Sequence, residues 1–121
     1  MDKEELKKRT KQFALRVIKL VGALPKDTVG RAIGGQLVRA GTLVGANYRS
    51  ACKARSRAEF VAKIGVVEEE ADESAFWMEL IVEAKLLRKT RVEALLQEAE
   101  ELVAIMAASR KSASRGRKRE K

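Results

Sequence analysis

The spacing of apolar residues between positions 28 and 54 is the feature that most constrains the fold of this chain. At about 100° per residue, apolar side chains fall on one side of a helical wheel and basic side chains on another. The apolar positions are Val29, Ile33, Leu37, Ala40, Val44, Tyr48 and Ala51, and the basic ones are Arg31, Arg39, Arg49 and Lys53. This segment is therefore predicted to be one long amphipathic helix that buries a single face.

Three further helices are predicted around it. Apolar residues recur at helical spacing from Leu6 to Leu24, and Pro25 ends that pattern because the residue before a proline is steered out of the helical region. Ser56 to Glu59 and Thr90 to Glu93 have the pattern of a capping box, which opens a helix. The predicted helices cover residues 2–23, 28–54, 56–88 and 90–110.

Composition agrees with an all-α fold. The chain has 121 residues, the size of one domain, with only one proline and few aromatic residues. Because the predicted second and third helices are joined by so short a link, they should lie side by side and antiparallel. We predict an antiparallel up-down four-helix bundle over residues 1–110. Residues 111–121 lack an apolar face and are predicted to be a disordered basic tail.

Histidine is absent, and this excludes most catalytic sites built from side chains alone. A Ser-His-Asp triad, a Cys-His pair and histidine-ligated zinc are all ruled out. The acidic run at residues 68–73 could hold Mg²⁺ or Ca²⁺, but a charged face that pairs with neighbouring helices is the simpler interpretation. We expect no catalytic residue, metal, cofactor or small-molecule substrate. No segment has the pattern of a membrane span or signal peptide, so a cytoplasmic protein is expected.

Glycine recurs on a third face of the predicted second helix, at Gly30, Gly34, Gly41 and Gly45. Glycine inside a helix costs about 0.5 to 1 kcal/mol relative to alanine, so the stripe indicates a close approach by a helix of the same bundle or of a neighbouring subunit. A loosely formed helix is the alternative. Residues 75–87 are apolar almost all round, which favours a subunit interface. The predicted interface residues are Gly34, Gly41, Gly45, Phe76, Trp77, Leu80 and Ile81.

Charge is unevenly distributed along the chain, whose formal net charge is +9. Residues 29–63 carry seven basic and one acidic residue, whereas residues 64–109 carry four basic and eleven acidic ones. A basic surface of this kind binds phosphates with little sequence specificity and strong salt dependence. Arg39 is instead expected to pair with Asp72 and Glu73. The predicted nucleic-acid-binding residues are Arg31, Arg49, Lys53, Arg55, Arg57, Arg115, Arg117, Lys118 and Arg119; a solvated surface and a solubilising tail are the alternatives.

Residues 24–87 resemble the four-helix-bundle family of the 23S rRNA-intervening sequence protein. The resemblance lies in the Leu24-Pro25 turn, the run Gln36 to Arg39, Gly45-Ala46-Asn47, the Arg55 to Phe60 junction, and the acidic stretch with Trp77 and Leu80. With the flanking helices it covers about residues 5–108. Many members have a Glu-Gly pair after the matching asparagine, where this chain has Ser50-Ala51, so no role of that glutamate carries over.

This resemblance implies a bacterial bundle that assembles into a ring-shaped homo-oligomer, a pentamer, with no catalytic residues to carry over. A related bundle accompanies the reverse transcriptase of diversity-generating retroelements and binds nucleic acid. The leading hypothesis is a non-enzymatic oligomer that binds RNA, DNA or a nucleic-acid-bound protein through basic surfaces. The alternative is a ring-shaped scaffold for protein-protein interaction with no direct nucleic-acid role.

Overall fold

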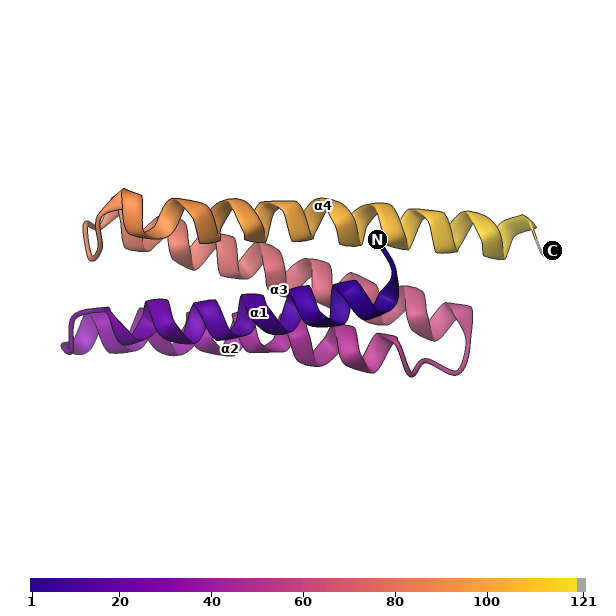
Figure 1. The fold of residues 1–121 in the computed structure, drawn as a ribbon, viewed down its shortest axis with the longest axis horizontal. Helices are drawn as coiled ribbons and strands as arrows, with labels where there is room; N and C mark the ends of the chain where they lie inside the picture. Colours follow the sequence, from indigo (N-terminus) through magenta and orange to yellow (C-terminus); the bar gives the residue numbers. More distant parts are fainter. Residues whose placement is uncertain (120–121) are drawn as a thin grey trace.

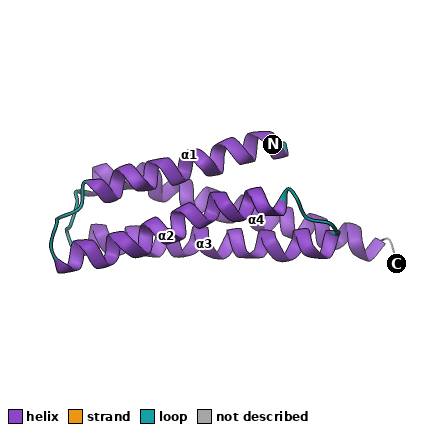
Figure 2. Cartoon of the chain, turned by 90° about the horizontal axis from the view of Figure 1, so that it is seen from below, coloured by secondary structure: helices purple, strands orange, loops and turns teal. Residues whose placement is uncertain are grey.

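Residues 1–119, the part of the chain that this computed structural model describes, form four α-helices and no strand. They are α1 (Lys3–Gly22), α2 (Thr28–Ala51), α3 (Arg57–Glu83) and α4 (Lys89–Arg119). Successive helices run in opposite directions, and both termini lie at the end where α2 is linked to α3 (Figure 1). Figure 2 shows the α1–α2 and α3–α4 links together at the opposite end. The predicted antiparallel up-down bundle is confirmed.

The first three helices each begin at a capping side chain, as the capping box at Ser56 predicts for α3. Carboxylate oxygens of Asp2 and Asp27 each accept the backbone N–H three residues ahead, at 2.8 Å in both cases. The hydroxyl of Ser56 accepts the N–H of Glu59 at 3.0 Å. The Glu59 carboxylate returns to the backbone N–H of Arg55 at 2.9 Å, one residue before the position expected from a regular capping box. These bonds satisfy donors that the first helical turn leaves unpaired.

The end of α3 falls at Glu83, so the prediction that this helix extends to residue 88 is wrong. Lys85 adopts a left-handed conformation with φ of 59°. The N–H of Leu86 then bonds to the carbonyl of Ile81 at 2.9 Å, and that of Lys85 to Val82 at 3.0 Å. This pair of bonds is a Schellman turn, which usually has glycine where Lys85 stands. The apolar run of the sequence therefore continues beyond the helix itself.

Helix α4 differs from its prediction at both ends. It begins at Lys89, which places Thr90 inside the first turn rather than at the cap. It also continues past Arg110 to Arg119, so the segment predicted to be disordered is helical as far as residue 119. Residues 110–115 contain no proline and consist of residues that a helix tolerates. Residues 120 and 121 lie outside the described part, and side chains are described only as far as Arg115.

The core runs along the three seams between consecutive helices, whereas α1 contacts α4 only slightly. Its largest fully buried side chains come from all four helices: Phe13, Val17, Leu37, Val44, Tyr48, Ile64, Val67, Met78, Ile81, Val92, Leu102 and Met106. Arg9 adds a polar link between α1 and α4, since its guanidinium donates to both carboxylate oxygens of Glu98 at 2.7 Å. Helix α1 is therefore held mainly by α2.

The glycine stripe of α2 faces α1 of the same chain. A Cβ atom at Gly41 would lie 2.8 Å from both methyl carbons of Val17, and one at Gly45 would lie 3.2 Å from the carbonyl oxygen of Thr10. One at Gly34 would lie 3.0 Å from a methyl carbon of Val21. The predicted close approach thus occurs within the bundle, so the glycine stripe by itself gives no ground for placing these three glycines at a subunit interface.

Candidate nucleic-acid interface

The predicted nucleic-acid-binding residues separate into two groups at opposite ends of the bundle. Arg31 lies near the start of α2, about 27 Å from Arg49 along the helix axis at 1.5 Å per residue. The others lie at the end of α2, on the link to α3, at the start of α3 and on the last turns of α4 (Figure 1). We call this end of the bundle the basic end; its cationic side chains are Lys3, Lys53, Arg55, Arg57, Lys111 and Arg115.

Three predicted residues continue α4 beyond the described side chains. The backbone of Arg117, Lys118 and Arg119 is helical and continues α4. Nothing more is assigned to them, because the side-chain description stops at Arg115.

A groove between α1 and α2 adjoins the basic end. It has a volume of about 410 Å³ and is lined by Lys7, Lys8, Lys11, Ala14, Thr42, Gly45, Ala46 and Arg49. No carboxylate lines it. Lys7 forms an exposed ion pair with Glu4 at 3.0 Å, whereas Lys8, Lys11 and Arg49 form no ion pair with any residue of the described chain. The groove therefore offers at least three unneutralised cations to an anionic ligand.

The three lysines of this groove belong to the lysine-rich first helix, which favours nucleic-acid binding, but they are not among the predicted binding residues. Their spacing at positions 7, 8 and 11 places them on one face of α1. That face forms a groove only because α1 packs on the glycine stripe of α2. Reflecting α1 through Pro25 would have brought them opposite residues 39–43, a few residues short of Gly45 and Arg49.

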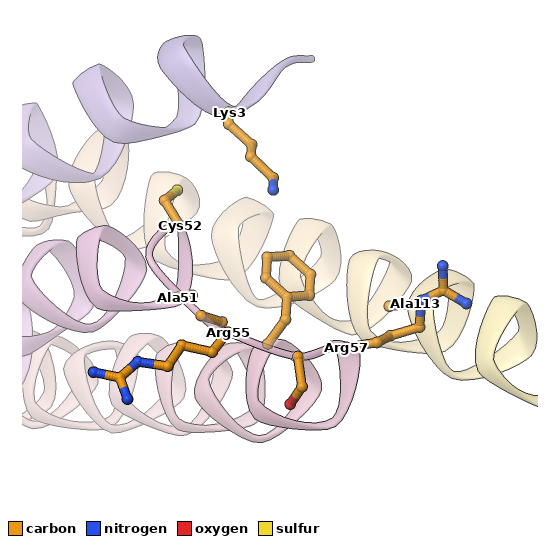
Figure 3. A pocket seen from close by; sticks show the side chains of 9 residues that line it. Lys3, Ala51, Cys52, Arg55, Arg57 and Ala113 are labelled. Carbon is orange, nitrogen blue, oxygen red and sulfur yellow. The ribbon is translucent and has the colours of Figure 1, made fainter.

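A second hollow, which we call the junction pocket, lies at the basic end itself. It has a volume of about 460 Å³ and is lined by Lys3, Ala51, Cys52, Ala54, Arg55, Ser56, Arg57, Phe60 and Ala113. Figure 3 shows Lys3 reaching from α1 toward the α2–α3 link, with Arg55 and Arg57 extending on opposite sides. The Lys3 ammonium lies 5.1 Å from the centre of the Phe60 ring, a cation-π geometry. Segments distant in sequence thus build one cationic pocket.

Acidic residues of α3 and α4 neutralise other arginines of the bundle. Arg39 lies 3.5 Å from carboxylate oxygens of both Glu70 and Glu73, which confirms its predicted pairing with α3, although Glu70 takes the place expected for Asp72. Arg110 donates to Glu68 at 3.0 Å. The acidic run thus serves helix pairing, and within residues 1–119 no group of potential ligands is placed to hold a metal ion.

Glu70 is the buried member of this acidic run. Burial raises the pKa of its carboxyl group, a hydrogen bond shared with Glu73 raises the pKa further, and the charge of Arg39 opposes both effects. One carboxylate oxygen of Glu70 has no hydrogen-bond partner. The positive charge of Arg39 therefore offsets only part of what burial costs the ionised Glu70 carboxylate. This pair lies on the α2–α3 seam, away from the groove.

The four apolar residues of α3 that were predicted to lie at a subunit interface differ in how exposed their side chains are. Ile81 is fully buried in the core of the single chain, so assigning it to a subunit interface is wrong. Phe76 is 50% exposed and packs edge-on against Trp77, with ring centres 5.1 Å apart. Trp77 and Leu80 are half-buried. Sequence analysis missed Leu15 and Ile18, which are also half-exposed, on α1.

No helix within residues 1–119 is long and apolar enough to cross a membrane.

Comparison with known proteins shows the family of this chain and a solved structure of similar fold. The sequence profile of the family described as "23S rRNA-intervening sequence protein" matches residues 2–108, which include α1, α2, α3 and most of α4. A crystal structure from Bacteroides thetaiotaomicron, described as a protein of unknown function from the S23 ribosomal protein family, is 28% identical. Its TM-score is 0.84, and the match covers 92% of this chain and 99% of the other. None of the curated proteins matches.

Proposed function

The chain belongs to the family of the 23S rRNA-intervening sequence protein, and we propose that it binds RNA through the basic end and the α1–α2 groove without catalysing a reaction. The observation that carries the proposal is the division of the cations. Arg9, Arg39 and Arg110 are paired with acids of neighbouring helices. The side chains of Lys8, Lys11, Arg49, Lys53 and Arg55 form no ion pair in the described part of the chain.

Binding of this kind is governed by phosphate charge. Lysine and arginine contacts to phosphates release condensed counterions, and for single strands the logarithm of the binding constant falls with that of the salt concentration by about 0.7 per contact. Such contacts position the ligand but read no base sequence. We therefore expect tight binding at low salt, steep weakening as salt is added, and little dependence on RNA sequence.

The proposal is tested by neutralising the groove and, separately, an equal number of cations at the opposite end. The groove variant carries Lys8→Gln, Lys11→Gln and Arg49→Gln. The control carries Lys26→Gln, Arg31→Gln and Lys89→Gln, all exposed and unpaired within residues 1–115. Fluorescence anisotropy with a labelled unpaired RNA should show the salt slope reduced by about 2 in the groove variant, at about 0.7 per contact, with a much smaller change in the control.

Two outcomes of this experiment would contradict the proposal. Equal loss in both variants would indicate that net charge alone drives binding. Failure of the wild-type protein to bind RNA at low salt would remove the nucleic-acid function altogether.

A second candidate function is a homo-oligomeric ring, with a pentamer as the expected size, that acts as a scaffold for another protein. The observation that favours it is a match between two exposed faces. Leu15 and Ile18 lie on α1 beside its lysines, whereas Phe76 and Val66 lie among the acidic residues of α3. A head-to-tail contact between these unlike faces would bury both apolar pairs and could close into a ring.

Light scattering tests the oligomer independently of RNA. Phe76→Glu should dissociate it, because a charge would be buried at the contact. Val29→Glu is the matched control, since Val29 is a similarly exposed apolar residue at the opposite end of α2 from the basic end. A monomeric wild-type protein at micromolar concentration would contradict the ring.

A further inference from the structure

Phe60 differs from the other aromatic residues of the chain in its surroundings. Phe13 and Tyr48 are buried in the core, and Phe76 and Trp77 pack on each other on α3 beside Glu73 and Glu79. Phe60 is half-buried and lies at the basic end. It lines both the junction pocket and an adjacent hollow of about 600 Å³ that it shares with Arg57 and Ala113. Among these five residues, Phe60 alone combines an accessible ring with surrounding cations.

Phe60 packs against the hydrophobic core, and a charge lies over its ring. The Lys3 ammonium lies 5.1 Å from the ring centre, and Lys3 itself is exposed at the start of α1. The negative face of an aromatic ring attracts such a cation, but the contact is weak at an exposed site. A flat ligand can take its place, and the displaced ammonium can then turn toward an anionic group of the same ligand.

The walls of the junction pocket fit such a ligand. Ala51, Ala54 and Ala113 contribute small side chains to the lining, and the volume of about 460 Å³ lies in the range of pockets that hold small ligands. Arg55 and Arg57 extend on opposite sides of the pocket (Figure 3). An aromatic ring and arginine side chains that line one pocket can bind a nucleobase by stacking and its phosphates by charge.

We propose that the junction pocket holds one unpaired nucleotide of an RNA strand, with its base stacked on Phe60 and its phosphates beside Arg55 and Arg57. This inference rests on the proposed RNA-binding function and adds a preference for single strands over duplexes. A base inside a duplex is stacked on both faces, so it cannot reach the ring without being unpaired. The α1–α2 groove, which needs only phosphates, has no such requirement.

The test compares an unpaired oligoadenylate with the same strand paired to oligouridylate, each binding to full-length protein at low salt. Phe60→Leu keeps an apolar side chain against the core but removes the aromatic surface. It should weaken binding of the single strand by about 5-fold to 100-fold and leave duplex binding unchanged. Val29→Ala, at a half-exposed apolar residue near the start of α2 and at the opposite end of the bundle, is the control and should change neither.

A fluorescence signal separates stacking from a merely structural role of Phe60. In a Phe60→Trp, Trp77→Phe double variant, the only tryptophan lies in the junction pocket, and stacking of adenine should quench its emission. We expect quenching by oligoadenylate and not by the duplex. Absence of quenching when the strand is bound would overturn the stacking proposal.

The failures of the two proposals are distinguishable. If wild-type protein binds single strand and duplex equally and Phe60→Leu affects neither or both alike, the stacking proposal fails while RNA binding stands. If wild-type protein binds neither probe, both proposals fail.

Discussion

Helix α2 meets its two neighbours in contrasting ways, and the contrast explains which arginines of the bundle are left for a ligand. Toward α1 it presents glycines, and the edge of that seam is lined by three lysines and Arg49 with no acid among them. Toward α3 it presents Arg39, which is held by Glu70 and Glu73. Two arginines on one helix, Arg39 and Arg49, therefore have different roles because they border different seams.

Overfilling the α1–α2 seam is the strongest way to break this contrast. Gly41→Ala would place a Cβ atom 2.8 Å from both methyl carbons of the fully buried Val17. We expect the free energy of unfolding to fall by about 1 to 3 kcal/mol from overpacking, measured by urea denaturation. Gly35→Ala is the control, since nothing lies within 4 Å of its Cβ position. There the gain in helix propensity should stabilise the protein by about 0.5 to 1 kcal/mol.

Equal behaviour of the two alanine variants would contradict the close packing of α1 on α2. A stabilised Gly41→Ala protein would indicate that Val17 moves freely, and the glycine stripe would then need another explanation.

The α2–α3 seam should respond to pH, because the pKa of Glu70 is raised in the folded protein above its ordinary value of 4.5. The folded state then holds this proton more tightly than the unfolded state. The contribution of Glu70 to the free energy of unfolding therefore falls as pH rises from about 4.5 toward the raised pKa. Glu70→Gln, which imitates the protonated form, should be more stable than wild type at pH 7 and similar to it below pH 4.5.

Thermal unfolding of both proteins at several pH values measures this difference. If wild type and Glu70→Gln differ in stability by the same amount at acidic and neutral pH, the carboxyl group of Glu70 does not have a raised pKa at this seam.

Most of the fold follows from local signals, whereas the candidate site depends on how the helices pair. The caps of α1, α2 and α3 are set by Asp2, Asp27 and Ser56 within a few residues of each helix start, so they were predictable. The end of α3 was not, because Lys85 takes a conformation in which glycine is the usual signal. Which residues the groove lysines face, and that Glu70 pairs with Arg39, depend on the register between helices. Folding the sequence back at a turn predicts that register only to within a few residues.

Single substitutions of Arg49 and Arg39, the two contrasting arginines on α2, should have the smallest effects. Arg49→Gln should lower the salt slope of RNA binding by about 0.7, the loss of one phosphate contact. Arg39→Gln should leave the slope unchanged, because that guanidinium is already paired with α3. Anisotropy titrations at a series of salt concentrations provide both slopes, and an equal decrease for both variants would show that the pairing of Arg39 does not withhold it from RNA.

The central claim is that RNA binds at the basic end and in the α1–α2 groove, and mapping the position of bound RNA tests it most directly. Titration of unpaired RNA into isotope-labelled full-length protein, followed by the backbone amide signals, locates the contact residue by residue. The account predicts shifts concentrated at Lys8, Gly45, Lys53 and Phe60, with little change at Arg31 and Lys89 at the opposite end of the bundle. Shifts centred on Arg31 and Lys89, or no shifts at low salt, would contradict it.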